Sequence, residues 1–217
     1  MMDEPVPPTP RRTNDPEGLR RRVLDVAAAS FQARGYHATS MHDIMREAGA
    51  TGGALYHHFP TKKAVGLAVI RDRVAAQVAG TWIAPVQAAA DALDGIAAVF
   101  AAIADGLDRR GAVAGCPVNN LALELSLADP DFQRALQAVF AGWQAAIADR
   151  LRQDQRSGRL GPADADDLAA FVVGTYSGAM ALAKAGQNAG PLKACARQLM
   201  AVLAPLRVAA ASASARG

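Results

Sequence analysis

Alanine constrains the fold of this chain more than any other feature, because it occupies 51 of the 217 positions. Alanine is the strongest helix former among the amino acids and is depleted in β-strands. Aromatic residues, which favour strands, make up only 5% of the sequence. No segment alternates apolar and polar residues convincingly at the two-residue period of a strand. Composition and pattern together predict an all-α protein.

Glycine and proline divide the chain into a series of expected helices. These helices span residues 18–34, 41–48, 52–58, 61–79, 85–109, 117–127, 130–156, 164–186 and 190–207. Residues 1–17 and 209–217 show no helical periodicity and are expected to be disordered tails.

Several classes of protein are not expected from this sequence. It has no uninterrupted apolar stretch of about eighteen residues, as a transmembrane helix requires, and residues 1–15 lack the apolar region of a secretory signal. Cys116 and Cys195 are too few for a disulfide framework and match no zinc-binding spacing. No histidine follows His58, which excludes the ligands of a di-iron helical bundle. We therefore expect a cytoplasmic protein without a metal or another cofactor.

Basic residues and histidines are concentrated near the N-terminus. Residues 18–66 carry a net charge of +4, whereas residues 1–17 carry −2 and residues 67–217 carry +1. All four histidines lie between His37 and His58. This distribution indicates a small module for an anionic partner, joined to a larger and nearly neutral body.

A helix-turn-helix pattern follows the first predicted helix. Ser40 is a good N-cap, and Asp43, three residues later, can complete a capping box. Gly49 supplies the turn between two short helices, where a left-handed backbone is expected. Leu55 and Phe59 are four residues apart and are the expected core anchors of the second short helix.

Two consecutive motifs give this region a specific resemblance to a known family. Arg34-Gly-Tyr-x-Ala-Thr-Ser-Met-x-Asp-Ile-x-x-Glu-Ala-Gly precedes Gly53-Ala-Leu-Tyr-x-His-Phe-Pro-x-Lys62-Lys63, and together they resemble the N-terminal signature of TetR-family transcriptional regulators. The resemblance implies an all-α dimer with a three-helix DNA-binding domain and a larger helical domain. We accordingly predict a helix-turn-helix domain at 18–62 and a ligand-binding and dimerisation domain at 63–208.

The resemblance also implies which residues contact double-stranded operator DNA. Small residues on the second short helix allow it to approach a major groove, where Tyr56 and His57 can reach phosphates or base edges. At Gly52 the sequence departs from many members, which carry a basic or polar side chain there. The expected contact positions are Ser40, Thr51, Gly52, Gly53, Tyr56, His57, His58 and Lys62. Lys62 and Lys63 stand unfavourably at a helix N-terminus, which suggests that they face a phosphate backbone.

Shorter motifs in the C-terminal part resemble LmrA/YxaF-type repressors. They are Gly115-Cys-Pro-Val-Asn-Asn-Leu-Ala-Leu-Glu124, Phe140-Ala-Gly-Trp143 and Gly178-Ala-x-x-Leu-Ala-Lys184. This resemblance implies a repressor that a small hydrophobic or aromatic effector releases from a palindromic operator. The scarce aromatic residues on inward helix faces suggest a cavity for that effector. The residues expected to line it are Trp82, Phe100, Ile103, Cys116, Asn120, Leu123, Glu124, Phe140, Trp143, Ile147 and Tyr176.

Small residues recur at near-helical spacing in the predicted helix 164–186. They are Gly174, Ser177, Gly178, Ala181 and Ala185. Because small side chains let helices approach closely, we expect them in a homodimer interface, with packing inside the chain as the alternative.

Three other functions stay open at this point. Cys116 precedes a proline at a helix start, where a lowered thiol pKa could make it an oxidant sensor, although a small buried residue is the ordinary role. A small helical enzyme is disfavoured, because no nucleophile–base pair or phosphate-binding glycine loop is found. A constitutive DNA-binding protein without an effector would be favoured by a closed C-terminal core.

Overall fold

The computed structural model describes residues 15–208, and these form an all-α structure. It begins with α1 (Pro16–Arg34) and ends with α11 (Gly190–Leu203) and a short 3-10 turn, η3 (Ala204–Leu206). Within this range the β-type pairing is limited to an isolated bridge between Leu160 and Arg207. The predicted fold class is therefore confirmed. The predicted tail at 209–217 and residues 1–14 of the other tail lie outside the described residues.

Helix α1 begins two residues before its predicted start. The Asp15 side chain accepts a hydrogen bond from the Gly18 amide at 2.8 Å, and Pro16 occupies the first helical position. Both residues suit a helix N-terminus, because the first amides of a helix lack partners within it. Residues 15–17, assigned above to a disordered tail, thus belong to α1 and its cap.

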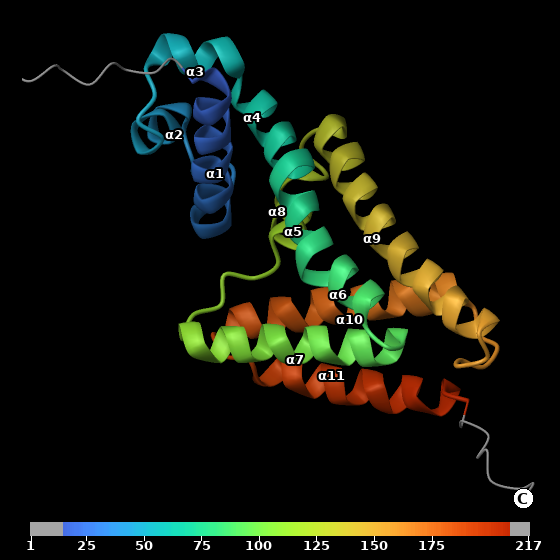
Figure 1. Cartoon of the computed structure of the whole chain (residues 1–217). Helices are drawn as coiled ribbons and strands as arrows, with labels where there is room; N and C mark the ends of the chain where they lie inside the picture. Colours follow the sequence, from blue (N-terminus) through green and yellow to red (C-terminus); the bar gives the residue numbers. More distant parts are fainter. Residues whose placement is uncertain (1–14, 209–217) are drawn as a thin grey trace, which may run out of the picture.

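Helices α2 (Met41–Glu47) and α3 (Gly52–His58) form the predicted helix-turn-helix. Ser40 and Asp43 make a reciprocal capping box at the start of α2, as expected. Gly49 has a φ of +62°, which places it in the left-handed region that glycine adopts without strain. Leu55 and Phe59 are buried and anchor α3 against α1. The three helices gather at one end of the molecule (Figure 1).

A long helical rod leads from this domain into the rest of the protein. It consists of α4 (Lys62–Val69), η1 (Ile70–Val74), α5 (Ala75–Val78), η2 (Ala79–Ile83) and α6 (Ala84–Ala88). Both η1 and η2 are π-type turns, and the Ala84 amide accordingly bonds the carbonyl five residues back, on Ala79. The prediction that one helix ends near Ala79 and another begins at Pro85 is wrong. The π-type turn changes the backbone pairing directly before Pro85, so that its missing amide hydrogen does not end the helix.

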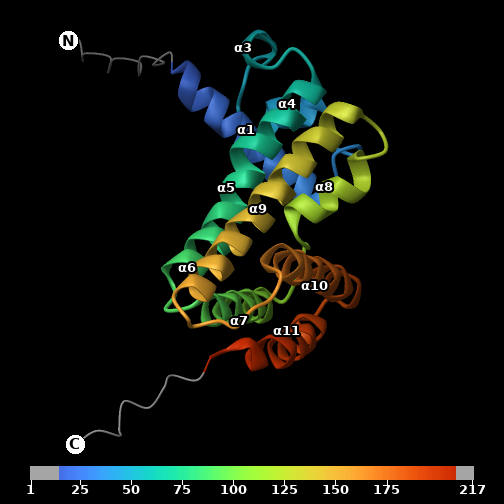
Figure 2. The ribbon, with the colours of Figure 1, turned by 90° about the vertical axis from the view of Figure 1, so that its right-hand side faces the viewer.

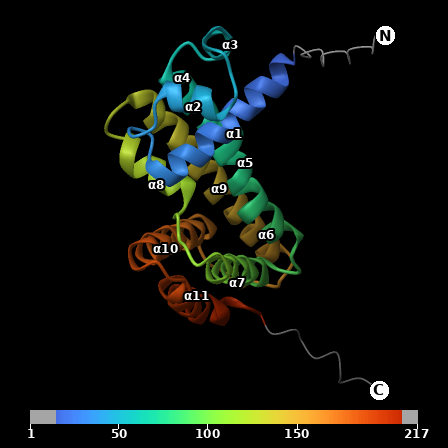
Figure 3. The same cartoon turned by 90° about the vertical axis from the view of Figure 1, so that its left-hand side faces the viewer.

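The C-terminal helices complete the architecture. They are α7 (Ala92–Arg110), α8 (Pro117–Leu125), α9 (Pro130–Arg156), α10 (Ala165–Gly186) and α11. The rod and α9 run side by side along the molecule, and α7, α10 and α11 lie together at the end opposite α3 (Figures 1 and 2). Helix α8 lies between the N-terminal domain and α10 (Figure 3).

Helix α10 is long and apolar enough to cross a membrane by length and composition. In the structure it packs against α9 and α11. Its residues Val172, Tyr176 and Met180 are buried there. Burial accounts for part of its hydropathy, since 39% of its most apolar window is buried.

Four aromatic side chains form the centre of the C-terminal core. The ring centroid of Trp82 lies 4.8 Å from Tyr176, 5.2 Å from Trp143 and 5.4 Å from Phe100. Tilted and edge-to-face contacts of this kind are favourable beyond the burial of their area. Because the four residues come from η2, α7, α9 and α10, the cluster joins the rod to the C-terminal helices.

A buried carboxylate ties α9 to the turn before α7. Asp154 accepts hydrogen bonds from the Ala92 amide at 2.6 Å, from Arg159 at 2.7 Å and from Arg150 at 3.4 Å. Arg150 also donates to the Gln87 carbonyl at 2.8 Å. Burial alone would raise the pKa of Asp154, but the amide and the two guanidinium groups outweigh it and lower that pKa.

We expect Asp154→Asn to reduce the free energy of unfolding by about 3 kcal/mol, because it leaves buried Arg150 without its counter-charge. The measurement is urea unfolding at neutral pH. Asp149→Asn, on the same helix but exposed, is the control and should leave the stability nearly unchanged. Equal stability of the Asp154 variant and the wild type would contradict this role.

The same carboxylate makes stability depend on pH. Because the folded-state pKa of Asp154 is lowered, the ionised side chain contributes fully to the free energy of unfolding above the unfolded-state pKa of about 4. This contribution is lost as the pH falls through the lower folded value. In Asp154→Asn this part of the acid dependence should be absent.

Candidate nucleic-acid surface and internal cavity

The outer face of α3 is exposed at the end of the molecule opposite α11 (Figure 1). Thr51, Gly53 and His57 are exposed, and Tyr56 keeps 53% of its side chain accessible. The opposite face is held by buried Leu55. A short helix that is anchored on one side and bare on the other can enter a DNA major groove.

The other predicted contact positions surround this face. Ser40 is exposed, whereas Gly52 and His58 are half-buried. The hydroxyls of Ser40 and Thr51 cap α2 and α3, accepting backbone hydrogen bonds at 3.0 Å and 3.4 Å. A groove runs between α3 and the start of α1, and its lining includes Arg22, Gly49, Thr51, Gly53, His57 and His58. Most of the predicted positions therefore share one surface, while their contact with DNA stays a prediction.

Lys63 faces the protein and not the open surface. Its ammonium lies 2.6 Å from a carboxylate oxygen of Asp129 and 2.6 Å from one of Asp131, at the start of α9. Hydrogen bonds to these two carboxylates raise the pKa of Lys63. The interpretation that Lys63 faces a phosphate backbone is thus corrected, because α9 supplies its anionic partners.

Lys62 and Glu124 hold the loop between α1 and α2. Lys62 donates to the His37 carbonyl at 3.2 Å, and its ammonium lies 4.3 Å from the centre of the Tyr36 ring. Glu124, on α8, accepts hydrogen bonds from the backbone amides of Tyr36 at 2.9 Å and His37 at 2.7 Å. Burial lowers the pKa of Lys62, and the charge of Glu124 partly offsets this. Only one of the three ammonium donors is used in these contacts, and a DNA contact by Lys62 stays a prediction.

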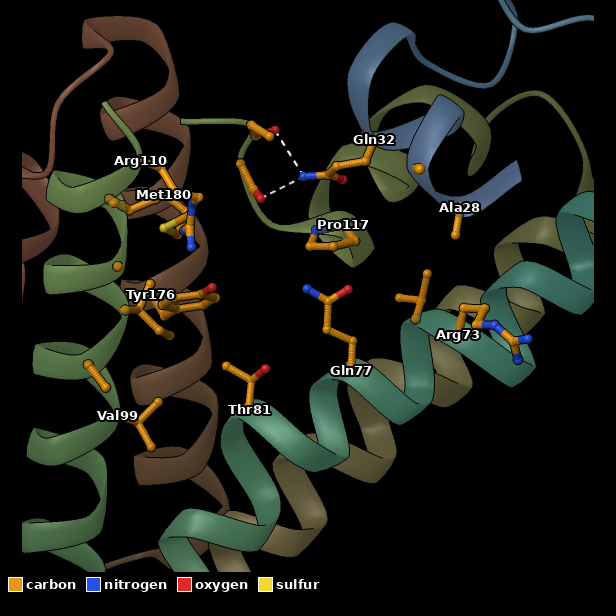
Figure 4. A pocket seen from close by; sticks show the side chains of 18 of the residues that line it. Ala28, Gln32, Arg73, Gln77, Thr81, Val99, Arg110, Pro117, Tyr176 and Met180 are labelled. Carbon is orange, nitrogen blue, oxygen red and sulfur yellow. Dashed lines mark hydrogen bonds between the residues drawn. The ribbon is translucent and has the colours of Figure 1, made fainter. Parts of the chain in front are cut away.

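A cavity of about 1080 Å³ lies between the N-terminal domain and the C-terminal helices. Its walls come from α1, the rod, α7, α8, α10 and the loop after α7 (Figure 4). Apolar lining residues include Val69, Val74, Val99, Leu107, Leu121 and Met180. The polar and charged ones are Gln32, Arg73, Gln77, Thr81, Arg109, Arg110 and Tyr176. A mostly apolar cavity with a few polar groups is typical of a site for a small organic molecule.

One polar bridge forms part of the cavity wall. The side-chain amide of Gln32 donates to the carbonyls of Ala114 at 3.1 Å and Gly115 at 2.8 Å (Figure 4). Asn120 donates to the Gln32 side-chain oxygen at 3.2 Å and accepts from the Lys184 ammonium at 3.2 Å. These contacts connect α1 with the loop after α7, with α8 and with α10.

Comparison with known proteins gives both halves of the chain the same assignment. Residues 23–69 match the tetR family of bacterial regulatory proteins, and residues 92–198 match the C-terminal domain of LmrA/YxaF-like transcriptional regulators. The uncharacterized HTH-type transcriptional regulator Rv0196 of Mycobacterium tuberculosis is 30% identical over 193 residues, which cover 86% of this chain and 95% of that protein. The chain belongs to the TetR family.

Two further similarities agree with membership of the TetR family. YxaF of Bacillus subtilis, an uncharacterized HTH-type transcriptional regulator, is 27% identical over 181 residues, covering 83% of this chain and 92% of that protein. A TetR transcriptional regulator from Chloroflexus aurantiacus has 28% identity and a TM-score of 0.78, covering 89% of this chain and 98% of that chain. The protein is therefore a DNA-binding transcriptional regulator and not an enzyme. The predicted resemblance to LmrA/YxaF-type proteins is also confirmed for the C-terminal domain.

Most residues predicted to line an effector cavity lie elsewhere in this TetR-family protein. Ile103 and Tyr176 do line the cavity. The prediction is wrong for a buried group whose side chains pack in the core, namely Trp82, Phe100, Trp143 and Ile147. The three rings of this group pack in the aromatic cluster, of which Tyr176 alone among its four rings also reaches the cavity.

The remaining predicted residues are engaged or placed otherwise. The side chains of Asn120 and Glu124 make the hydrogen bonds described above. Leu123 is 79% exposed on the outer face of α8. Phe140 stacks on Trp143 with ring centroids 6.3 Å apart, and Cys116 is buried at the start of α8.

The rod contributes cavity residues that were not predicted. Arg73, Gln77, Thr81 and Pro85 recur every four residues, and all of them line the cavity. This spacing of mostly polar residues on one helix was an available signal. The helix break expected between residues 79 and 85 divided this four-residue pattern between two predicted helices.

Cys116 occupies the N-cap position of α8, as predicted. Burial raises the pKa of its thiol and outweighs the backbone amides of Asn119 and Val118, which act in the opposite direction. The hypothesis of a lowered thiol pKa is therefore wrong. Because the thiolate is the reactive form, this environment weighs against sensing of oxidants by Cys116.

In a Cys195→Ser variant, we expect Cys116 to react with Ellman's reagent at least about tenfold more slowly in the native protein than in denaturant. Burial limits both the access of the reagent and the ionisation of the thiol. The reciprocal variant Cys116→Ser keeps half-buried Cys195 and should show a smaller difference. Similar rates for Cys116 in the native and unfolded states would contradict its inert character.

Proposed function

We propose that the protein is a homodimeric repressor that binds a palindromic operator and leaves it when a small organic effector fills the cavity. The observation that carries this proposal is that both domains build the wall of one cavity. The wall includes Ala28, Phe31 and Gln32 of α1 together with Val99, Tyr176 and Met180 of the C-terminal helices. An effector bound there contacts both domains, so its binding energy can favour one relative placement over another.

The contacts between the domains supply a route for the response. Gln32 shares its hydrogen bonds with carbonyls on the cavity wall, and α1 packs against the rod. An effector that binds the DNA-free form better would shift the population away from the operator, and coupling of about 1–3 kcal/mol is typical. A constitutive DNA-binding protein would have no use for such a cavity.

We assign the reading of DNA to α3. Its exposed face offers Thr51, Gly53, Tyr56 and His57, with Gly52 between the first two. Ser40, His58 and Lys62 lie at its margins and would reach phosphates. In a dimer, two copies of α3 would enter successive major grooves about 34–36 Å apart. We keep the boundary between the DNA-binding and ligand-binding domains at residues 62–63 and begin the first domain at Asp15, the cap of α1.

We assign dimerisation to the outer faces of α10 and α11. Phe171 and Leu182 of α10 are 44% and 60% exposed, and Val202 of α11 is 57% exposed. Between the first two, a Cβ added to Gly174 or Gly178 would meet no described atom within 4 Å. An apolar stripe with small residues at its centre suits close approach by a second copy of the same helix.

We also propose a repressor role and a cytoplasmic location for this protein. DhaR of Mycobacterium sp. (strain GP1), 25% identical over 182 residues, is an HTH-type transcriptional repressor. We extend that role to this chain, in which a dimer on its operator would obstruct transcription. Action on chromosomal DNA would place the protein in the cytoplasm.

Tyr56→Ala should weaken operator binding at least about tenfold, because it removes a large exposed contact from the centre of α3. Fluorescence anisotropy with duplexes that carry the palindromes of the gene's own upstream region measures the affinity. The wild-type affinity should fall steeply with salt, as phosphate contacts require.

A matched control for this test is Val208→Ala, which removes another exposed apolar side chain, shortly after η3 and so at the other end of the described chain from α3. It should bind the operator like the wild type. If Tyr56→Ala also binds like the wild type, α3 does not read DNA as proposed. If no palindrome binds selectively, the proposed operator mechanism is wrong.

Gly178→Arg should convert the dimer to a monomer, because the open space that accepts the new side chain in one chain is occupied by the second copy. Light scattering should then give a mass of 22.5 kDa in place of twice that value, with unchanged helical circular dichroism. The control is Gly142→Arg on α9, where an added Cβ also meets no described atom within 4 Å. A Gly178→Arg dimer would rule out this face as the interface.

A further inference from the structure

The charged side chains in the cavity wall all carry the same sign. They are Arg73, Arg109 and Arg110, and no aspartate or glutamate belongs to the lining among residues 15–208. Arg109 and Arg110 are exposed, so their charges are accessible to an anion that enters the cavity. The cavity therefore has an electrostatic preference that its size and hydrophobicity do not reveal.

Arg73 already has its partners. Its Nε donates to Asp25 at 2.6 Å, and its terminal nitrogens donate to the carbonyls of Arg21 at 3.2 Å and Asp72 at 3.3 Å. These contacts hold the rod against α1. The guanidinium of Arg73 therefore already has partners within the protein and does not require a ligand.

Arg109 and Arg110, at the end of α7, both have no ion-pair partner within residues 15–208. Arg110 is distinguished by its position. Its guanidinium folds back over Gly106, so that a Cβ at Gly106 would lie 3.3 Å from one terminal nitrogen. Figure 4 shows Arg110 beside Met180 at the edge of the cavity. The neighbouring acid Asp108 is taken by Lys193 at 2.6 Å. The missing side chain at Gly106 thus leaves room for a guanidinium that the described part of the chain does not neutralise.

We propose that the effector is an amphipathic organic anion with a carboxylate that Arg110 binds and an apolar body that lies in the cavity. A guanidinium presents two parallel donors to a carboxylate, which is the strongest of its ordinary pairings. The apolar body would lie along Val99, Ile103 and Leu107, which share the cavity face of α7 with Arg110. This inference names the chemical class of the effector and rests on the proposed function.

Isothermal titration of the full chain without DNA tests the charge preference. The probes are decanoate and 2-naphthoate, which share the carboxylate but differ in the apolar body, and decanol and decylamine, which share the chain of decanoate but not its charge. We expect at least one carboxylate to bind, and decanol and decylamine to bind at least about tenfold more weakly than decanoate or not at all. The two carboxylates distinguish an aliphatic from an aromatic body.

Substitution identifies the responsible side chain. Arg110→Gln should weaken carboxylate binding at least about tenfold and leave any binding of decanol unchanged. Arg156→Gln changes another exposed arginine, at the end of α9, and should alter neither affinity. Melting temperatures of both variants equal to that of the wild type confirm that the fold is retained.

Three outcomes would overturn the inference. They are binding of decanol or decylamine as tight as that of the carboxylates, wild-type carboxylate binding by Arg110→Gln, and no binding of either carboxylate. Because no DNA is present in this assay, these results would leave operator binding by the repressor intact. Failure of operator binding in the anisotropy test would conversely leave the anion site standing.

Discussion

The placement of the DNA-binding helices depends on the burial of Tyr36 in the loop between α1 and α2. Its ring centroid lies 5.2 Å from that of Phe31 and 5.1 Å from that of Phe132, so it joins α1 to the start of α9. Gly66 of α4 permits this contact, because a Cβ there would come within 2.9 Å of both Tyr36 and Phe132. Burial raises the pKa of the Tyr36 phenol, which therefore stays neutral within the packed junction. Three helices thus meet at one side chain.

The junction at Tyr36 and the bridge at Gln32 hold the DNA-binding domain in different ways. The Tyr36 ring packs against Phe31 and Phe132, where close packing tolerates little displacement. The side chain of Gln32 bonds carbonyls in a cavity wall, and such bonds can be exchanged for a ligand or water at a small net cost. Under the proposed function, Tyr36 would act as the pivot of the domain and Gln32 as its movable contact.

The parts of the structure that could be predicted depend on residues close together in the sequence. The capping box of Ser40 and Asp43 and the left-handed Gly49 need only their own helical turns, and both are present. Lys63 is paired with Asp129, which is distant in the sequence, and no pattern in the sequence around Lys63 predicts this partner. The cavity draws its walls from α1, the rod, α7, α8 and α10, so its position depends on how helices cross. Aromatic residues were a poor guide because their rings pack best against one another.

The π-type turns of the rod determine which way its side chains face. In a regular α-helix, residues four apart point in directions that differ by about 40°. After three such steps the side chain points about 120° away from its starting direction and leaves the original face of the helix. Arg73, Gln77, Thr81 and Pro85 nevertheless all line the cavity. Turns closed by bonds to the fifth residue back hold more residues and reduce this drift. The rotational register of the rod therefore helps to form the binding site. A deletion of one residue within η1 or η2 would turn the following side chains away from the cavity, although none of those residues would itself be changed.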